Sequence, residues 1–282
     1  MSDKSGVLYV IATPIGNLED ISLRARRVLQ EVDLILAEDT RHSRILLDHL
    51  QIHTPMRSYH EHNERAVVAD LLGELRHGRS LALISDAGTP LLCDPGFPLV
   101  SAAHEQGVRI VPVPGPAAVT TALSVSGMAA DRFVFEGFLR GKAAARRERL
   151  KSLIRETRTM VFYEAPHRIL QLLEEIQEIM GGRREVCVGR ELTKKYETVY
   201  RGSCADVLGR IKDSPDQQLG EFVVILKGYG DREEPGPSEA VRVLQILLTH
   251  GLPVKLAASI TAAISGGKKN KLYRMALQLA EK

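Results

Sequence analysis

Short apolar runs alternate with longer stretches of helical period from Gly6 onward, and this rhythm restricts the possible folds more than any other feature. It is typical of βα units arranged around a mostly parallel sheet. The first half of the chain predicts five such units. Strands are expected at Val7–Thr13, Leu34–Ala37, Met56–Tyr59, Leu81–Ser85 and Val108–Pro112, and helices at Ile21–Gln30, Ser43–Leu50, Glu64–His77, Phe97–Glu105 and Ala117–Ser126. Asp20 and Thr40 are the polar residues expected to start the first two helices.

The rhythm changes after Gly127, where the strands become longer and more separated, which predicts a second α/β domain with antiparallel pairs. Its strands are expected at Arg132–Phe138, Thr159–Glu164, Glu185–Glu191, Thr198–Gly202 and Glu221–Gly228. Residues 230–238 combine charge, proline and glycine and are interpreted as a linker. Three helical segments follow it, broken at residues 251–253 and 265–267. We therefore predict an α/β protein with domains at 1–127 and 128–229 and a small helix-turn-helix-like unit at 239–282.

Composition excludes several classes of protein. The chain has 38 Lys and Arg residues against 35 Asp and Glu, a formal charge of +3, so a nucleic-acid surface must be a local patch. Its three widely spaced cysteines form no CxxC pair, which argues against a disulfide framework or a structural zinc site. No signal-peptide pattern and no run of 18 apolar residues is present, so we expect a cytoplasmic protein with no membrane partner.

Three loops at the predicted carboxyl ends of strands carry unusual residues. Residues 12–17 lack the GxGxxG pattern of dinucleotide-binding turns, which argues against a Rossmann dehydrogenase. Residues 85–96 form a loop far longer than the usual connection of about 2–6 residues. Residues 112–118 contain three prolines and a glycine, which make a rigid turn that a ligand can approach closely. Because α/β sheets bind ligands at this edge, the loops predict two rigid walls of a binding cleft.

The ordered motifs LYVIATPIGNLEDIS, LAEDTRHSR, SDAGTPLLCDPG, PVPGPAA, FYEAPHR and GRELTK resemble a known family. From about residue 7 to the C-terminus the chain is similar to the small-subunit ribosomal RNA (cytidine-2′-O)-methyltransferase I family of the tetrapyrrole methylase superfamily. The resemblance implies a two-domain class III methyltransferase fold, a homodimer and S-adenosylmethionine bound between the domains. It also implies 2′-O-methylation of a cytidine ribose in the decoding region of small-subunit ribosomal RNA, either as naked RNA or in the assembled subunit.

Carried over motif by motif, the resemblance implies cofactor contacts in four loops. We expect Asp86 near the amino acid or ribose of the cofactor, and a backbone contact at Tyr163, where relatives place a methionine. The first loop departs from the glycine-rich pattern of the tetrapyrrole enzymes, which weakens a tetrapyrrole as substrate. The expected cofactor-binding residues are Pro14, Ser85, Asp86, Ala87, Gly88, Leu91, Gly115, Ala117, Ala118, Tyr163 and Leu192.

A ribose hydroxyl is a poor nucleophile, so a side chain that accepts its proton would assist the transfer. The candidates beside the predicted cleft are Glu164, Asp39, His167 and Glu191. Glu164 ranks first because it ends a strand, but an ion pair with Arg168 four residues later explains it equally well. Asp39 also fits a helix cap, and His167 fits a solvated or capping histidine better than a base. The His60-Glu61-His62 run has no third ligand cluster, so no metal is expected.

Two segments predict an RNA surface. Residues 140–158 hold eight Lys or Arg against two acids, and residues 255–274 hold five and no acid. A solvated helix face is the alternative for the first segment. The aromatic residues expected to stack on RNA bases are Tyr59, Tyr163 or Phe138. The expected RNA-binding residues are Arg41, Arg140, Lys142, Arg146, Arg147, Arg168, Arg190, Lys194, Lys268, Lys269 and Lys271.

Two other functions stay open at this point. The same fold could methylate a tetrapyrrole or another small molecule, although a macrocycle needs neither basic segment. The chain could also be a non-catalytic RNA-binding protein that kept the scaffold. Binding of S-adenosylmethionine would separate an enzyme from the latter.

Overall fold

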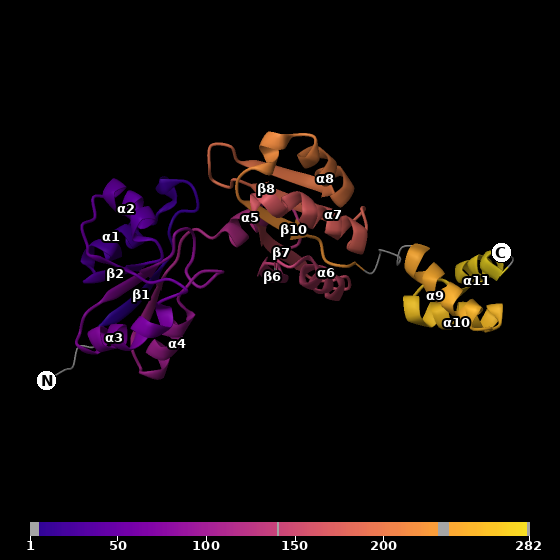
Figure 1. The fold of residues 1–282 in the computed structure, drawn as a ribbon, viewed down its shortest axis with the longest axis horizontal. Helices are drawn as coiled ribbons and strands as arrows, with labels where there is room; N and C mark the ends of the chain where they lie inside the picture. The colour runs from indigo at the N-terminus through magenta and orange to yellow at the C-terminus, as the bar shows by residue number, and fades with distance from the viewer. Residues whose placement is uncertain (1–5, 140, 231–236, 281–282) are drawn as a thin grey trace. The chain divides into compact units, whose positions relative to one another are not determined.

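The computed structural model describes residues 6–139, 141–230 and 237–280 (Figure 1). The chain divides into two compact units, with the boundary between Gly228 and Tyr229. The first unit contains two five-stranded sheets, and the second contains three helices. The part of the predicted linker at residues 231–236 lies outside the described residues.

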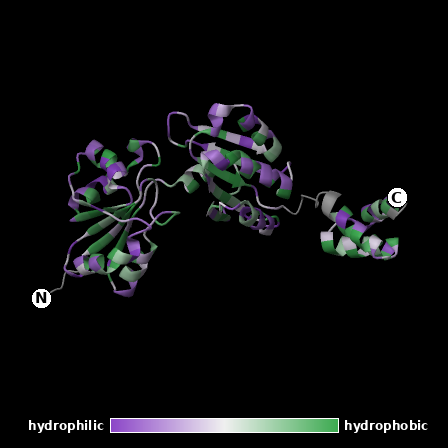
Figure 2. Cartoon of the chain, in the orientation of Figure 1, coloured by the Kyte–Doolittle hydropathy of each residue, from purple (hydrophilic) through white to green (hydrophobic). Residues whose placement is uncertain are grey.

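The first sheet is fully parallel, with strand order β3-β2-β4-β1-β5. Its strands are β1 Val7–Ile11, β2 Leu34–Ala37, β3 Met56–Ser58, β4 Leu81–Ile84 and β5 Arg109–Val113. The connecting helices are α1 Leu23–Glu31, α2 Thr40–His49, α3 Glu64–Arg76 and α4 Phe97–Glu105. The five predicted strands and the helices that follow the first four of them are therefore confirmed, and the strands are mainly hydrophobic (Figure 2).

Helices cover both faces of this sheet, and the core alternates along each strand accordingly. Ile11 and Ile35 pack with α1 and α2 on one face. Leu8 and Leu36 pack with α3 and α4 on the other. A strand buried on both faces has apolar residues at successive positions, which is why β2 and β4 consist of buried residues throughout.

The first two helices begin one or two residues from the expected caps. Ser22 accepts a hydrogen bond from Ala25 N at the start of α1, and Asp39 accepts one from Arg41 N at the start of α2. Asp20 instead ends a short 3-10 helix, Leu18–Asp20, and Thr40 is the first residue of α2. A side chain caps a helix only when its own backbone is extended, as it is at Ser22 and Asp39.

The second sheet is mixed, with strand order β6-β7-β10-β8-β9. Only β6 and β7 are parallel; β10 runs antiparallel to β7 and β8, and β9 antiparallel to β8, as predicted. The strands are β6 Phe133–Phe138, β7 Thr159–Glu164, β8 Glu185–Arg190, β9 Thr198–Ser203 and β10 Phe222–Leu226. The α-helices are α6 Ala143–Ser152, α7 Ile169–Met180 and α8 Cys204–Lys212, with 3-10 helices at Pro166–Arg168 and Pro215–Gln218.

Helix α5, Ala118–Ser126, packs on the second sheet, although the predicted boundary at residue 127 assigns it to the first domain. Its Val119 and Leu123 share an apolar cluster with Val161 of β7 and Val223 of β10. The opposite face of the sheet is covered by α6, α7 and α8. Helix α5 therefore covers one face of the second sheet. The chain passes from the first sheet to the second in the loop between β5 and α5.

The second unit contains α9 Pro237–Thr249, α10 Val254–Ser265 and α11 Lys269–Ala280 (Figure 1). The three predicted helical segments are confirmed, and their breaks fall where glycine and proline predict them. Helix α9 begins at Pro237, so the last two residues of the predicted linker are helical. Leu244, Ala258 and Leu272 each come from a different helix and meet in one buried cluster.

Candidate functional site

Hydrogen bonds join the loops after β1 and β4 into one wall. Thr13 and Gly88 form an isolated antiparallel bridge, with Thr13 N to Gly88 O at 2.8 Å and Gly88 N to Thr13 O at 3.1 Å. The buried Thr13 hydroxyl also donates to Ser85 O at 3.0 Å. Because β1 and β4 are neighbours in the parallel sheet, their carboxyl ends bring these two loops together.

The loop after β5 joins the same wall. Thr89 Oγ1 donates to Pro116 O at 3.1 Å. Gly115 lies so close to the first loop that an added Cβ would be 3.1 Å from Ala12 Cβ. This close approach explains why position 115 is a glycine. The hydrogen bond to Pro116 places the start of α5 beside the loop after β4.

The opposite wall comes from one edge of the second sheet. Strands β6, β7 and β8 end at this edge, and the antiparallel β10 begins there, with Phe222 opposite both Glu164 and Arg190. Tyr163 accepts a hydrogen bond from Val119 N at 3.1 Å, which ties the wall to α5. Its ring packs edge-to-face against Phe135 and Phe138, at centroid distances of 4.9 and 5.6 Å. Burial raises the pKa of Tyr163 to about 12, so its hydroxyl stays protonated.

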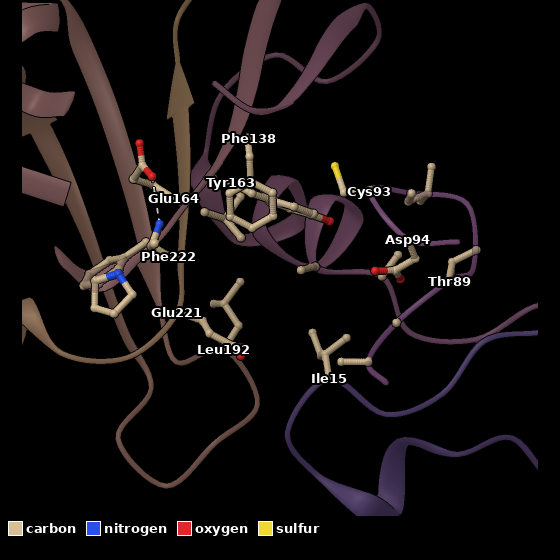
Figure 3. A pocket seen from close by; sticks show the side chains of 18 residues that line it. Ile15, Thr89, Cys93, Asp94, Phe138, Tyr163, Glu164, Leu192, Glu221 and Phe222 are labelled. Atoms are coloured by element: carbon tan, nitrogen blue, oxygen red, sulfur yellow. Dashed lines mark hydrogen bonds between the residues drawn. The ribbon is translucent and has the colours of Figure 1, made fainter. Parts of the chain in front are cut away.

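A cavity of about 340 Å³ lies between the two walls (Figure 3). Its volume lies in the range of small-molecule sites. Most of its surface is apolar or made of small residues, and its acidic side chains come from both walls. It is lined by Ile15, Ala87, Gly88, Thr89, Leu92, Cys93, Asp94, Ala117, Ala118, Phe138, Tyr163, Glu164, Ala165, Pro166, Leu192, Glu221, Phe222 and Val223.

Strained backbone occurs on both sides of the cavity. Leu91 and Cys93 in the loop after β4 have φ of 73° and 69°, and Glu191 and Thr193 after β8 have φ of 50° and 66°. Residues with a side chain rarely adopt this left-handed conformation. Such strain persists where surrounding contacts hold it, and it is concentrated at functional sites.

Six of the eleven expected cofactor-binding residues line the cavity: Ala87, Gly88, Ala117, Ala118, Tyr163 and Leu192. Pro14, Ser85, Asp86, Leu91 and Gly115 do not. The buried Ser85 hydroxyl bonds within its own loop, and Asp86 accepts a hydrogen bond from Asp39 N at 3.0 Å. These two residues therefore hold the loop in place through hydrogen bonds and do not line the cavity.

Asp94 and Glu221 are cavity carboxylates that the sequence analysis did not name as site residues. Burial raises the pKa of Asp94 to about 6, the neighbouring Glu38 and Asp86 carboxylates add to the rise, and a hydrogen bond with Ser85 opposes it. Burial and Asp86 also raise the pKa of Glu38. The sequence did contain a signal for Asp94: it is the second acidic residue of the long loop, eight residues after Asp86, and it begins an Asp-Pro-Gly turn.

Of the four candidate proton acceptors, only Glu164 lines the cavity. Its side chain is buried and paired with Arg168, with Nε to Oε1 and Nη2 to Oε2 both at 3.1 Å. Ala165 N donates to the same carboxylate at 2.9 Å, and Arg168 also donates to Leu139 O at 2.8 Å. The ion pair that the sequence offered as the alternative is therefore present.

The other three candidates lie outside the cavity lining. Asp39 caps α2, and its hydrogen bonds with Arg41 lower its pKa to about 2. His167 is exposed on the 3-10 helix after β7. Glu191 accepts hydrogen bonds from Lys194 Nζ at 3.0 Å and Glu221 N at 2.9 Å. Burial alone would raise the pKa of Glu191, but these hydrogen bonds make the net shift downward.

The basic helix α6 is an ion-paired surface, which corrects part of the expected RNA patch. Arg146 is 2% exposed and makes two hydrogen bonds to Glu175, at 2.6 and 2.7 Å, so it cannot contact a phosphate as it stands. Arg147 pairs with Glu178 at 2.8 Å. Lys142 is exposed at the start of the helix, and Arg140 lies outside the described residues. The alternative of a solvated, salt-bridged helix face describes α6 better.

Two further expected RNA contacts are also structural. Arg190 is buried and donates to three backbone carbonyls, those of Leu219, Tyr196 and Asp216, at 2.6, 3.1 and 2.9 Å. Arg168 is occupied by the Glu164 pair. These two arginines position the edge of the second sheet and are not available to bind RNA.

Lys194 and Arg41 keep part of their side chains accessible. Lys194 bonds to Glu191 and Glu221, both at 3.0 Å, and its aliphatic stem covers Gly16, where an added Cβ would be 2.4 Å from Lys194 Cγ. Arg41 pairs with Asp39 at 3.1 Å on the surface. Lys268, Lys269 and Lys271 are exposed in the second unit.

Of the three aromatic residues expected to stack on bases, Tyr59 is wrong, because it is 1% exposed in the core of the first sheet. Tyr163 is partly buried and engaged with α5. Phe138 is 54% exposed at the rim of the cavity. Phe138 is the most exposed ring of the three, and both it and Tyr163 line the cavity.

The described residues also bear on metals, thiols and membranes. Among them, no three His, Cys, Asp or Glu side chains converge in a way that could hold a metal ion. Cys93 is exposed, Cys187 and Cys204 are buried, and all three are free thiols. Within residues 6–139, 141–230 and 237–280, no helix has the length and apolar character needed to cross a bilayer.

Comparison with known proteins places this geometry in a family. Residues 7–208 match the family described as Tetrapyrrole (Corrin/Porphyrin) Methylases, and residues 234–280 match the RsmI C-terminal HTH domain. The fold resembles uroporphyrin-III-C-methyltransferase from Thermus thermophilus, with a TM-score of 0.55 and 20% identity over 79% of this chain and 94% of that one.

Full-length relatives share the whole domain arrangement. Ribosomal RNA small subunit methyltransferase I of Pseudomonas aeruginosa is 50% identical over 276 residues, covering 97% of this chain and 98% of the relative. The protein of the same name from Escherichia coli O157:H7 is 47% identical over 276 residues, covering 98% and 96%. This chain therefore belongs to the ribosomal RNA small subunit methyltransferase I family, S-adenosylmethionine-dependent enzymes with the tetrapyrrole methylase fold.

Proposed function

We propose that this enzyme methylates the ribose 2′-OH of a cytidine in the decoding region of small-subunit ribosomal RNA. The observation that carries the proposal is the 50% identity over nearly the full length to a ribosomal RNA small subunit methyltransferase I. The match includes the helical unit, so it extends beyond the part shared with the tetrapyrrole enzymes.

The cavity residues fit S-adenosylmethionine, a cationic molecule with a flat purine. Asp94 supplies a carboxylate opposite a positive sulfur or ammonium group. Ile15, Leu192 and Val223 supply apolar surface for a ring. The small residues at positions 87, 88, 117 and 118 let the ligand approach the backbone. When bound, this cofactor would supply a sulfonium methyl group whose carbon an alcohol oxygen can attack, with the neutral thioether as the leaving group.

The enzyme's own contribution to the proposed reaction is mainly positioning. Holding an oxygen in line with a reacting carbon can supply much of the acceleration of a displacement. The hydrogen-bonded loops after β1, β4 and β5 form a fixed wall, and the Glu164–Arg168 pair fixes the opposite edge. We retain Glu164 as the proposed proton acceptor for the 2′-OH because it alone among the four candidates lines the cavity.

Methyl transfer to three acceptors tests the proposal. Tritiated methyl from S-adenosylmethionine is offered to small subunits from cells lacking this enzyme, to the same RNA stripped of protein, and to a mixture of tetrapyrrole precursors. We expect label in RNA, at a ribose that resists alkaline cleavage. Label only in the tetrapyrrole fraction would replace the proposed substrate, and binding of RNA without any transfer would favour a non-catalytic protein.

We also infer a homodimer that works in the cytoplasm, where small ribosomal subunits are available as substrate. The family resemblance supports both statements. Sedimentation equilibrium of the full chain is expected to give about twice the 31.1 kDa mass of one chain. A single-chain mass at micromolar concentration would contradict the dimer without affecting the proposed reaction.

A further inference from the structure

The turn after β8, residues 191–194, has an unusual backbone and forms part of the cavity wall. Glu191 and Thr193 have φ of 50° and 66°, and Leu192 between them lines the cavity. Glu191 N donates to Glu221 O at 2.9 Å, and Lys194 N donates to Glu191 O at 3.0 Å. Residues with a side chain keep a left-handed backbone only where surrounding contacts hold it. The contacts of this turn therefore decide where one wall of the cavity lies.

Lys194 holds the carboxylates of this turn together. Its Nζ donates to Glu191 Oε1 and to Glu221 Oε2, both at 3.0 Å. Glu191 Oε1 also accepts a hydrogen bond from Glu221 N at 2.9 Å. The pKa of Lys194 is raised: burial opposes the rise, and the hydrogen bonds with the two carboxylates outweigh it. The ammonium group is therefore charged and fixed beside Glu221, which lines the cavity.

The aliphatic stem of Lys194 reaches across to the loop after β1. A Cβ added at Gly16 would lie 2.4 Å from Lys194 Cγ and 3.1 Å from its Cε. It would also lie 3.0 Å from Thr193 Oγ1. Gly16 does not have a positive φ, so its backbone conformation is open to residues with a side chain. The close approach of Lys194 is what leaves no room for one.

The two walls of the cavity also meet directly beside this contact. Ile15 precedes Gly16 in the loop after β1, and Leu192 lies two residues before Lys194. Ile15 and Leu192 belong to one apolar cluster and line the cavity from its two walls (Figure 3). A shift of the lysine stem on Gly16 would therefore change the spacing between two residues that face a bound ligand.

We propose that Lys194 is a positioning residue that sets the spacing of the two cavity walls for S-adenosylmethionine. Carboxylates at the edge of the second sheet hold its ammonium group, and its stem rests on the backbone of Gly16. It acts through Leu192 and Glu221, which line the cavity. The inference concerns the cofactor and does not depend on the proposed RNA substrate. It differs from the phosphate contact expected for Lys194, because Glu191 and Glu221 already use its charge.

Calorimetric titration of full-chain variants with S-adenosylmethionine tests this role. Lys194→Ala removes both stem and ammonium group, and the affinity is expected to fall about tenfold or more, since small displacements of positioning groups are costly. Lys194→Met keeps an unbranched stem over Gly16 and should bind within about threefold of wild type. Gly16→Ala forces the stem away from the loop and should lower the affinity by about tenfold.

The double variant, Gly16→Ala with Lys194→Ala, shows whether the two residues act through their contact. Without the lysine stem, the added methyl group meets only Thr193 Oγ1 at 3.0 Å, which needs a shift of a few tenths of an ångström. Adding Gly16→Ala to Lys194→Ala is therefore expected to change the affinity by less than about twofold. Additive losses would show that the two residues act independently, and the inference would be wrong.

Lys212→Ala and Gly209→Ala in α8 are the matched controls. Lys212 pairs with Glu174 at 3.6 Å, an added Cβ at Gly209 meets nothing within 4 Å, and neither residue lines the cavity. Both controls are expected to bind S-adenosylmethionine within about twofold of wild type. Thermal unfolding of every variant checks that the chain is folded. If Lys194→Ala does not fold, Gly16→Ala and Lys194→Met still decide the question.

The remaining outcomes each overturn the inference in a recognisable way. Equal losses in Lys194→Ala and Lys194→Met would assign the effect to charge alone and leave the stem without a role. Wild-type affinity for S-adenosylmethionine in Lys194→Ala, together with weaker RNA binding, would return Lys194 to a phosphate contact. By contrast, transfer of methyl groups by the wild-type enzyme to a tetrapyrrole and not to RNA would refute the proposed function and leave this inference standing.

Discussion

Asp94 places a carboxylate of unusual pKa where a cationic ligand would bind. Because that pKa is about 6, the side chain is ionised at pH 8 and increasingly neutral below pH 6. We expect the affinity for S-adenosylmethionine to fall as the pH drops from 8 to 5. Asp94→Asn should lower the affinity at pH 8 by about tenfold or more, since a hydrogen bond to a charged group is worth about 1.5–3 kcal/mol, and should flatten the pH dependence. Isothermal titration calorimetry at four pH values measures both.

Asp86→Asn provides the comparison, because it removes a charge outside the cavity lining and keeps an oxygen to accept from Asp39 N. Its effect on affinity should be clearly smaller than that of Asp94→Asn.

The folding stability of Asp94→Asn gives an independent readout. A carboxyl whose folded pKa is raised favours the folded state below its unfolded pKa, and loses that contribution as pH rises through about 6. Asp94→Asn should therefore raise Tm at pH 8 and not at pH 4.

The Arg146–Glu175 pair provides the second prediction. Both side chains are almost completely buried, at 2% and 7% exposure. Removing one partner leaves the other charge buried without compensation, so Arg146→Ala should lower the free energy of unfolding by about 3–5 kcal/mol. Urea denaturation measures this loss. The surface variant Arg147→Ala, which loses an exposed pair with Glu178, should cost less than about 1 kcal/mol. Equal losses would mean that Arg146 is not a buried anchor.

The residue-level site was only partly predictable from the sequence. Small residues such as Ala117 and Gly88 were located by their motifs, since a close backbone approach requires their size. Arg146 was misjudged because its partner Glu175 is 29 residues away on another helix, and linear charge counts cannot see such pairs. Asp94 was missed for a related reason. Its role depends on burial beside Glu38 and Asp86, which only the folded loops create.

At the scale of elements, the bulge in β6 connects the two walls of the cavity. The register of β6 against β7 shifts between Phe135 and Gly137, and Gly137 has a φ of 60°. A Cβ added there would lie 2.6 Å from Cys93 Sγ, in the loop after β4. We expect Gly137→Ala to lower the free energy of unfolding by about 1–3 kcal/mol through strain and crowding, and to weaken S-adenosylmethionine binding because Cys93 lines the cavity.

Gly73→Ala is the matched control for Gly137→Ala. Gly73 lies inside α3, where an added Cβ meets nothing within 4 Å, so this substitution should stabilise the protein by about 0.5–1 kcal/mol. Chemical denaturation and cofactor titration of both variants test the pair. Unchanged binding and stability in Gly137→Ala would show that the bulge does not hold the loop after β4.

The strands were predictable because each is a short apolar run between turn residues, and β2 and β7 match their expected bounds in full. The assignment of α5 was not. Its sequence is apolar on the side that packs, but nothing in that pattern tells which of two sheets it will cover. The sequence also could not predict that β10 pairs with both β7 and β8, since strand order depends on contacts between distant segments.

At the scale of the whole molecule, the division into two units predicts separable functions. All cavity residues lie before the boundary at Gly228, and the basic residues 240–280 lie after it. A chain ending at Gly228 should bind S-adenosylmethionine within about twofold of the full chain and lose at least tenfold in RNA affinity. Calorimetry and filter binding test this prediction. Loss of both activities together would show that the second unit is needed to fold the first.

The excess of Lys and Arg in residues 240–280 gives the two binding steps different responses to acid. Residues 240–280 contain six Lys or Arg and no Asp or Glu, so this stretch has no carboxylate to take up a proton between pH 8 and pH 5. Asp94 loses its charge over the same interval. Mild acid would therefore leave the enzyme attached to RNA while it releases its methyl donor, so that the docked but unloaded enzyme accumulates and can be isolated at a single pH.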